Sequence, residues 1–247
     1  MAEPNPELTK PTRHPGRVKT YITEKGIDEQ TARDLVARDL MIERQKDRSL
    51  TDPLTGLYNR RWLFGEQGQN ANSGAELRRL FERTRRDLEA LTYIAIDVDH
   101  FKNINDKFGH SEGDRVLKNL ARIFRENLRF TDEVIRINGE AIRTGGEEFV
   151  IILQNTRLVT RDQLSDVLNR LNNVLAKSKD FPESKPPTIS IGIATYDSTD
   201  INGAIQNSEQ LVDYADKALY HAKETGRNKA VIFTGAPDGQ PQFEDLK

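Results

Sequence analysis

Cysteine is absent from the 247-residue chain, which excludes disulfides, zinc sites with thiolate ligands and cysteine nucleophiles. Long apolar runs are also lacking. None approaches the roughly 18–20 residues that a membrane helix needs, and the N-terminus has no signal-peptide core. A large excess of one charge is missing too, because 37 basic residues oppose 39 acidic ones, a formal net charge of −2. We therefore expect a soluble, cytoplasmic protein without an overall field that attracts nucleic acid or an anionic membrane.

The length allows one large domain with short appendages. Residues 1–27 are rich in proline and poor in large apolar residues, which predicts a flexible arm. Residues 28–50 have a helical composition with a thin apolar stripe that is too short for a long coiled coil. This predicts a stalk helix, packed against its own domain or against a partner copy. The main domain is expected over residues 51–234, followed by a disordered tail over 235–247.

Apolar periodicity predicts the elements of the main domain. Amphipathic helices are expected over residues 77–91, 116–128, 164–175 and 211–222. Strands are expected over 91–98, 187–195 and 230–233, and two more within 133–153, with turns at Asn138-Gly139 and Gly145-Gly146. The order β-α-β-β-α-β, with a further helix and strand, predicts an α/β fold of the α+β kind. This is a ferredoxin-like βαββαβ palm, with a central, mostly antiparallel sheet and helices on one face.

Residues 144–149 read Thr-Gly-Gly-Glu-Glu-Phe. Gly145 and Gly146 allow a tight turn and leave room for a bulky ligand. Glu147 and Glu148 then begin a strand, whose neighbouring side chains point to opposite faces, so the two acids cannot share one role. Two acids at a turn suit a hard metal ion such as Mg²⁺. The alternative is an ordinary hairpin turn with solvated charges.

Asp97 lies at the end of the apolar strand 91–98. An acid in this position is costly to desolvate unless a cation or hydrogen-bond donors compensate it. In the expected fold this strand neighbours the hairpin at Gly145, so Asp97 and Glu147 can meet over the sheet. Two close carboxylates repel each other unless a cation lies between them, which makes Mg²⁺ the natural third partner.

Asn105 and Asp114 lie on either side of a glycine-flanked turn and form a complementary pair for guanine. A carboxylate accepts hydrogen bonds from the ring N–H and the exocyclic amine, and an amide serves the remaining base edge. Adenine would place an acceptor against Asp114, which predicts rejection by a factor on the order of 10⁴. The alternative is that Asp114 only caps the following helix.

Four segments, in order, resemble the GGDEF diguanylate cyclases over about residues 50–233. They are residues 52–61, 97–114, 145–149 and 216–228, of which the first reads Asp-Pro-Leu-Thr-Gly-Leu-Tyr-Asn-Arg-Arg. The resemblance implies a catalytic domain of the nucleotide cyclase kind, which joins two GTP into cyclic di-GMP and releases two pyrophosphates. It also implies Mg²⁺ as cofactor, with Mn²⁺ as an alternative, and a homodimer in which each subunit holds one GTP.

Matching positions in the family pattern imply roles for individual residues. The Mg²⁺ ligands would be Asp97, the Val98 carbonyl and Glu147, and Glu147 would also accept the 3′-hydroxyl proton. Glu148 takes the adjacent catalytic position, and Lys102 would stabilise charge in the transition state. The implied substrate contacts are Asn105 and Asp114 on guanine, Lys223 and Arg227 on the terminal phosphates, and Phe101, His110, Gly145 and Gly146 around them.

Arg129 and Asp132 match the Arg-x-x-Asp motif of the family's inhibitory product site. The match implies that cyclic di-GMP is an inhibitor as well as the product. The segment from 133 to 144 is longer than the family pattern, which predicts a lengthened hairpin beside the active site. The family pattern has an arginine shortly before the two glycines, and Arg136 and Arg143 can both take that position.

Three readings compete with an active cyclase. An unrelated nucleotidyl-transfer palm domain is disfavoured by the four motifs in order. A non-catalytic receptor for GTP or cyclic di-GMP is disfavoured, because Asp97, Lys102, Glu147, Lys223 and Arg227 are all present. An enzyme that makes a different cyclic dinucleotide is disfavoured by Asp114 in the guanine position.

Overall fold

The structure is a computed structural model, and it describes residues 15–26, 28–65, 76–127, 129–132, 135–154, 161–178, 180–181, 186–200 and 203–246. The chain divides into two compact units, Met1–Leu50 and Thr51–Lys247.

The described part of the first unit is a pair of helices, α1 (Pro15–Lys25) and α2 (Glu29–Leu50). Helix α2 corresponds to the helix expected over 28–50, and Asp28 accepts a hydrogen bond from the Thr31 amide at its start. Helix α1 lies where a flexible arm was expected, so that prediction is wrong for Pro15–Lys25. Val18 and Ile22 of α1 pack against Ala32 and Val36 of α2, and these few apolar contacts stabilise the short helix.

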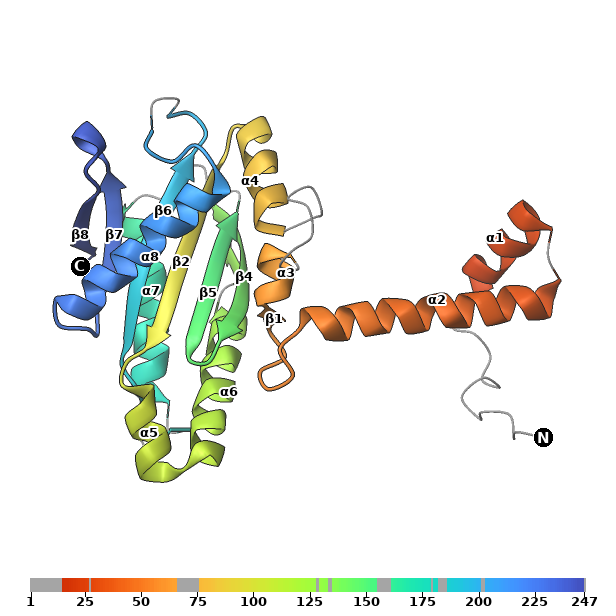
Figure 1. Cartoon of the computed structure of the whole chain (residues 1–247), viewed down its shortest axis with the longest axis horizontal. Coiled ribbons are helices and arrows are strands. Elements are labelled where there is room, and N and C mark those ends of the chain that lie inside the picture. The colour runs from red at the N-terminus through yellow and green to blue at the C-terminus, as the bar shows by residue number, and fades with distance from the viewer. Residues whose placement is uncertain are drawn as a thin grey trace. The chain divides into compact units, whose positions relative to one another are not determined.

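The second unit is built on one eight-stranded sheet (Figure 1). Seven strands follow the order β1-β4-β5-β2-β6-β7-β8, and β3 pairs with β4. The pairs β1–β4 and β6–β7 are parallel, and the other pairs are antiparallel. The strands are β1 (Tyr58–Asn59), β2 (Ala90–Val98), β3 (Arg129–Asp132), β4 (Ile135–Gly145), β5 (Glu148–Gln154), β6 (Ile189–Asp197), β7 (Ala230–Gly235) and β8 (Gln242–Leu246).

Six α-helices are described in this unit: α3 (Arg60–Phe64), α4 (Glu76–Asp87), α5 (Phe101–Phe108), α6 (His110–Asn127), α7 (Arg161–Lys177) and α8 (Ser208–Glu224). The elements β2, α6, β4, β5, α7 and β6 follow one another in a βαββαβ order, with β2 between β5 and β6. The predicted ferredoxin-like palm with a mostly antiparallel sheet is therefore confirmed.

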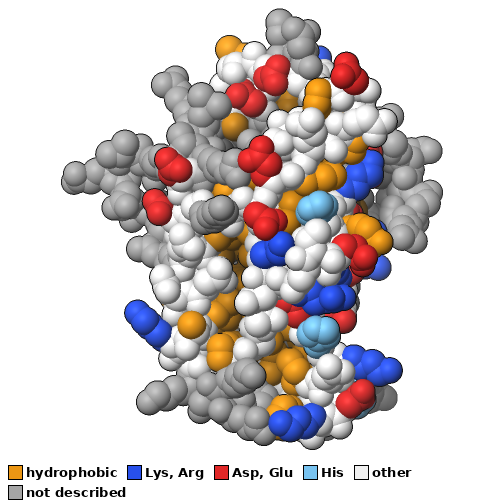
Figure 2. Space-filling model, turned by 90° about the vertical axis from the view of Figure 1, so that its left-hand side faces the viewer, with side chains coloured by type: hydrophobic (Ala, Val, Ile, Leu, Met, Phe, Trp, Pro, Cys, Tyr) orange, Lys and Arg blue, Asp and Glu red, His pale blue; other side chains and the backbone are white. Residues whose placement is uncertain are grey.

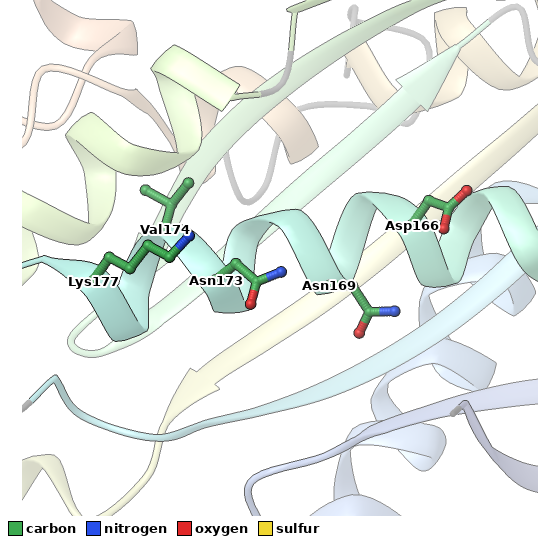
Figure 3. Close-up of a pocket in the computed structure, with 5 residues that line it drawn as sticks. All are labelled: Asp166, Asn169, Asn173, Val174 and Lys177. Carbon is green, nitrogen blue, oxygen red and sulfur yellow. The ribbon is translucent and has the colours of Figure 1, made fainter.

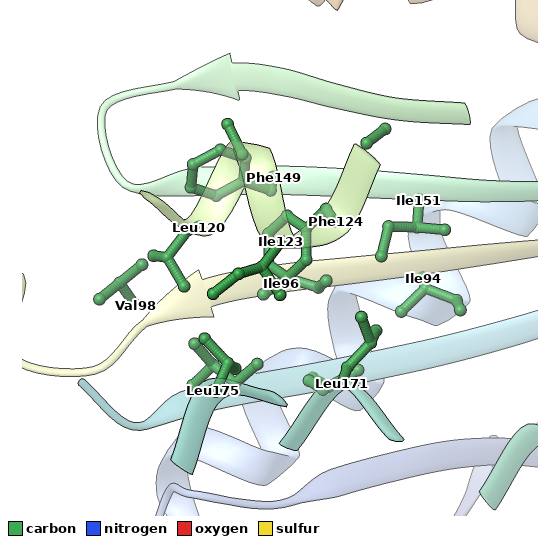
Figure 4. Packing of buried hydrophobic residues seen from close by; sticks show 14 of the residues in the cluster. Ile94, Ile96, Val98, Leu120, Ile123, Phe124, Phe149, Ile151, Leu171 and Leu175 are labelled. Atoms are coloured by element: carbon green, nitrogen blue, oxygen red, sulfur yellow. The ribbon is translucent and has the colours of Figure 1, made fainter. Parts of the chain in front are cut away.

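Helices cover both faces of the sheet, so the prediction of helices on one face is wrong. Along β2, Ile94, Ile96 and Val98 belong to a core with α6 and α7, which Figure 4 shows from close by. Tyr93 and Ala95 belong to a second core with α4 and α8. Every residue of β2 is buried, as expected for a strand that is covered on both sides.

Two further predictions are wrong in detail. Asn138 and Gly139 lie inside β4 and pair with β5, so they form no turn; the β3–β4 connection lies between Asp132 and Ile135. Pairing along both edges of the strand outweighs the local turn preference of Asn-Gly. The tail expected to be disordered contains β8, which pairs with β7 and places Phe243 against Phe233 and His221.

Candidate active site

The end of β2 and the turn between β4 and β5 lie side by side. Asp97 is the register partner of Glu148 in β5 and of Ser190 in β6. The Val98 amide donates a hydrogen bond to the Glu147 carbonyl, with 3.3 Å between nitrogen and oxygen. The structure thus brings the two predicted metal-ligating acids to the same end of the sheet.

The glycine turn leaves open space beside these acids. Gly146 has a φ of 46°, in the left-handed region that favours glycine. A methyl group added at Gly145 or Gly146 would meet no atom within 4 Å. Glu147 is half-buried and Glu148 is exposed at the start of β5. A ligand can therefore approach the backbone of the turn closely.

Lys223 forms an ion pair with Asp97, with 2.7 Å between Nζ and Oδ2. Burial raises the pKa of Asp97, and the nearby charges of Glu147 and Asp99 raise it further, whereas Lys223 opposes these effects. The carboxylate is therefore in an environment where a cation stabilises it. In the ligand-free protein, the ammonium group of Lys223 is this cation.

The donor set at the end of β2 fits a hard divalent cation. Asp97 and Glu147 offer carboxylate oxygens, and Val98, the last residue of β2, offers a backbone carbonyl. No cluster of three or more histidine, aspartate or glutamate side chains suited to a metal occurs in the part of the chain that the structure describes. Mg²⁺ commonly binds one or two carboxylates together with substrate phosphates, so two acids suffice.

Helices α5 and α6 carry the predicted guanine contacts. Gly109, with a φ of 85°, is the single residue between them. A Cβ on Gly113 would lie 1.9 Å from Asn105 Oδ1 and 3.2 Å from Phe101 Cζ, so this glycine lets the Asn105 amide lie directly on α6. Phe101 is buried in the core below.

Asp114 is not the cap of α6, because the helix begins four residues earlier, at His110. The alternative in which Asp114 only caps a helix is therefore wrong. Asp114, His110 and Lys102 are exposed, and Asn105 is half-buried. These side chains are accessible to a ligand above the α5–α6 corner.

Asp99 was missed by the sequence analysis. It is only 5% exposed, and its two oxygens accept three hydrogen bonds. Ser190 Oγ donates to Oδ1 at 2.6 Å, and Thr188 Oγ1 and the Asn228 amide donate to Oδ2 at 2.8 and 3.0 Å. The desolvation argument that singled out Asp97 applies equally to this second acid after the strand.

The turn that Asp99 holds follows α8 and contains Arg227. Arg227 and Asn228 have φ values of 61° and 48°, a left-handed conformation that costs a residue such as arginine roughly 1–2 kcal/mol and asparagine less. The Arg227 amide donates to the Ala222 carbonyl at 2.9 Å. Tertiary hydrogen bonds therefore maintain a backbone shape that is unfavourable for Arg227 by itself.

A second network that the sequence analysis missed joins the glycine turn to the start of the domain. Arg143 Nε and Nη2 donate to the Gly146 carbonyl at 3.0 and 2.8 Å, and Nη1 donates to both Asp52 carboxylate oxygens. Burial alone would raise the pKa of Asp52, but hydrogen bonds from Thr55 and Arg143 outweigh it and lower the pKa. Arg143 is thus the arginine that supports the turn.

Close packing of α8 on the sheet positions Lys223. A Cβ on Gly192 of β6 would lie 2.1 Å from the Leu219 amide nitrogen and 2.2 Å from the Ala215 carbonyl oxygen. Ala215, Ala218 and Ala222 are fully buried along the same helix. The absence of larger side chains at this contact allows α8 to approach β2 and β6 closely.

A hollow lined by Asp166, Asn169, Asn173, Val174 and Lys177 follows α7 alone (Figure 3). On the face that Figure 2 shows, basic and acidic side chains of the described residues are interspersed.

Arg129 and Asp132 lie in β3, and their side chains are outside the described part of the chain.

No helix in the ranges that the structure describes is both long and apolar enough to cross a membrane.

Comparisons with known proteins identify relatives of this arrangement. A family model described as "Diguanylate cyclase, GGDEF domain" matches residues 49–229. The diguanylate cyclase DgcP of Pseudomonas aeruginosa is 35% identical over 219 residues, which are 88% of this chain and 28% of that protein. The chain spans about half or less of the length of the first curated relatives it matches.

Solved structures of diguanylate cyclases also resemble this chain. The diguanylate cyclase SiaD of Pseudomonas aeruginosa, solved in complex with its activator SiaC, is 31% identical with a TM-score of 0.61. The match covers 87% of this chain and 73% of that one. The active GGEEF domain of a diguanylate cyclase from Vibrio cholerae is 31% identical with a TM-score of 0.55, and the match covers 70% and 96% of the two chains.

Proposed function

The chain belongs to the GGDEF diguanylate cyclase family, and from this premise we propose that it condenses two GTP molecules into cyclic di-GMP and two pyrophosphates. The observation that carries the proposal is the convergence of Asp97, the Glu147 turn and Lys223 at one end of β2. Two acids that favour a cation, beside the Lys223 ammonium group and an open glycine turn, suit a nucleoside triphosphate with its divalent ion.

In the proposed reaction Glu147 accepts the proton of a GTP 3′-hydroxyl. The 3′-oxygen attacks the α-phosphorus of the other GTP, and the bond from that phosphorus to the pyrophosphate oxygen breaks as the new bond forms. A second, equivalent step closes the ring. When bound by Asp97, Glu147 and the Val98 carbonyl, Mg²⁺ (or Mn²⁺) supplies neutralisation of phosphate charge.

The remaining residues orient GTP. Lys223 and Arg227 would hold the terminal phosphates, and Lys102 would stabilise the charge that develops during transfer. Asn105 and Asp114 would read guanine, with His110 close by at the start of α6. Phe101 is buried beneath Asn105, which supports a role in shaping the site.

The proposed chemistry requires a homodimer. A single subunit holds one GTP and supplies either the attacking hydroxyl or the phosphate under attack, so two subunits must face each other. This requirement has a direct test. Glu147→Gln subunits mixed with wild-type subunits should lower the specific activity of the wild type by forming impaired dimers.

We also propose that the product inhibits the enzyme through Arg129 and Asp132. Cyclic di-GMP should then slow the wild type, and Arg129→Ala should relieve the inhibition. Equal inhibition of the two proteins would exclude this site.

Product identification tests the proposed function. Purified protein is incubated with Mg²⁺ and GTP, ATP or both, and the products are identified by mass spectrometry. We expect cyclic di-GMP from GTP and none from ATP. Glu147→Gln should abolish the product, whereas Asp166→Asn, a change of the same kind on α7, should not. Binding of GTP without any cyclic di-GMP at high protein concentration would instead identify a nucleotide receptor.

A further inference from the structure

Asp99 is buried beside the candidate site, yet it is not a ligand in the proposed reaction. We infer that Asp99 is a positioning residue for Arg227: its carboxylate holds the turn after α8 in the backbone shape that presents the Arg227 guanidinium to the GTP phosphates. This inference rests on the proposed function and adds the means by which the phosphate contact is oriented.

The turn is fixed at three points along its backbone. Its first attachment is the Arg227 amide, which donates to the Ala222 carbonyl at 2.9 Å. Its second is the Asn228 amide, which donates to Asp99 Oδ2 at 3.0 Å. Its third is the Lys229 carbonyl, which accepts from the Ile191 amide at 2.9 Å as β7 joins the sheet. Of the three, only the Asp99 attachment uses a side chain.

The backbone of the turn needs such an attachment. Arg227 and Asn228 are consecutive residues in the left-handed region, and neither is glycine. Without the Asp99 acceptor, the Asn228 amide would lose its partner in this part-buried contact and the turn could relax. Relaxation would change the direction in which the Arg227 side chain leaves the turn.

The Arg227 side chain itself is exposed, and among the described residues no ion pair or hydrogen bond of its guanidinium is found. The main chain of the turn therefore sets where the Arg227 side chain begins and in which direction it leaves the backbone. A guanidinium that is left unpaired can bind a phosphate without first breaking another contact.

Asp99 is itself held firmly on the other side. Ser190 Oγ donates to Oδ1, Thr188 Oγ1 donates to Oδ2, and the Asp99 amide donates to the Thr188 carbonyl at 2.9 Å. These contacts connect the carboxylate to the start of β6. Asp99 thereby links the central sheet to the Arg227 turn through a hydrogen bond to Asn228, which lies 129 residues away in sequence.

The hydrogen-bond chemistry distinguishes two variants. Asp99→Ala removes every acceptor from the Asn228 amide. Asp99→Asn keeps one amide oxygen for it, and the Ser190 hydroxyl can accept from the new amide nitrogen because a hydroxyl both donates and accepts. The conservative variant should therefore retain the function that alanine loses. Ser190→Ala is the matched control, since it removes a contact to the other carboxylate oxygen only.

The test compares affinities for 3′-deoxy-GTP, which cannot condense, and for GMP, which lacks the terminal phosphates. In the full chain, Asp99→Ala should bind 3′-deoxy-GTP about tenfold more weakly and GMP as the wild type does. Asp99→Asn and Ser190→Ala should stay within about threefold of the wild type for both ligands. Adding Asp99→Ala to Arg227→Ala should cause no further loss, because the two changes remove the same contact.

Two further measurements separate positioning from folding. In the ligand-free protein, hydrogen exchange of the Asn228 amide should be fast in Asp99→Ala and slow in Asp99→Asn. Asn228→Gly should restore 3′-deoxy-GTP affinity in the Asp99→Ala background, since glycine adopts the left-handed shape without an anchor. If Asp99→Ala alone does not fold, the Asp99→Ala/Asn228→Gly variant supplies the test: it should bind 3′-deoxy-GTP within about threefold of the wild type, and a tenfold weaker affinity would overturn the inference.

Parallel loss of 3′-deoxy-GTP and GMP affinity in Asp99→Ala, or full additivity with Arg227→Ala, would overturn the inference while leaving the proposed function intact. A wild-type protein that bound neither 3′-deoxy-GTP nor GMP would contradict both the inference and the proposed function.

Discussion

The two sides of the candidate site are built differently. The α8 side, with Lys223 and Arg227, depends on contacts between residues far apart in the chain, such as Gly192 with Leu219 and Asp99 with Asn228. The α5–α6 side, with Asn105 and Asp114, is held by neighbours within one short segment; its close contact joins residues 105 and 113. Glycine permits the close approach on both sides. On the α8 side it makes room for backbone, and on the α5–α6 side for a side chain.

This difference teaches which part of a site can change without loss of the fold. A side chain displaced by a new methyl group can rotate to another rotamer, whereas a displaced helix backbone must move as a whole. We therefore expect damage on the α8 side to reduce stability and phosphate binding together. Damage on the α5–α6 side should reduce base recognition alone.

Gly192→Ala should have the largest effect. The new Cβ would lie 2.1 Å from the backbone of α8, so the helix must shift and carry Lys223 away from Asp97. We expect the free energy of unfolding to fall by about 3 kcal/mol, with loss of GTP binding. Urea unfolding and calorimetric titration measure the two effects. Gly16→Ala, where no atom lies within 4 Å, is the control, and equal stability of the two variants would contradict the packing argument.

Gly113→Ala applies the same change to the other side. The Cβ would displace the Asn105 amide, but alanine also favours the helix, so the free energy of unfolding should change by less than about 1 kcal/mol. Preference for 3′-deoxy-GTP over 3′-deoxy-ATP should fall about tenfold, because one base-edge contact is lost. Destabilisation comparable to that of Gly192→Ala would abolish the distinction between the two sides.

Asp97→Asn tests the electrostatics of the α8 side. Burial raises the pKa of Asp97 in the folded state, so the ionised carboxylate destabilises the ligand-free fold above that pKa. The variant should therefore unfold at higher urea concentration than the wild type at pH 8, although it would be inactive. The gain should disappear as the pH falls through the folded-state pKa toward the ordinary value of 3.8. A lower urea midpoint for the variant at pH 8 would mean that the Lys223 ion pair outweighs burial.

Asn228→Gly should have the smallest effect. Its φ of 48° suits glycine, so the change removes backbone strain but adds freedom to the unfolded chain, and the two terms nearly cancel. We expect the free energy of unfolding to change by less than about 1 kcal/mol and 3′-deoxy-GTP affinity to stay constant. Thermal unfolding and titration check this, and a large loss of affinity would indicate that the Asn228 side chain itself contacts the ligand.

The difference between contacts within one segment and contacts between distant segments also explains what the sequence could predict. The palm topology, the glycine turn and the place of Asp97 at the end of β2 follow from short-range patterns, and all three are present in the structure. The guanine pair lies within one short segment, so its members could be recognised together.

Other features depend on the tertiary fold and could not be read from local patterns. The choice of Arg143 over Arg136 rests on Asp52, which lies 91 residues away from Arg143 in sequence. Strand β8 forms because Phe243 packs against Phe233 and His221, and its residues show no strand alternation strong enough to predict it. Two-sided helix cover was overlooked, although the unbroken burial of β2 results from it.

One titration series tests the central claim, that the two sides recognise the two ends of one GTP, most directly. Wild-type protein with Mg²⁺ is titrated with 3′-deoxy-GTP, 3′-deoxy-ATP and GMP. The structure predicts that 3′-deoxy-GTP binds most tightly, that GMP loses the contribution of the α8 side, and that 3′-deoxy-ATP is rejected by a factor on the order of 10⁴. Similar affinities for all three ligands would contradict the account.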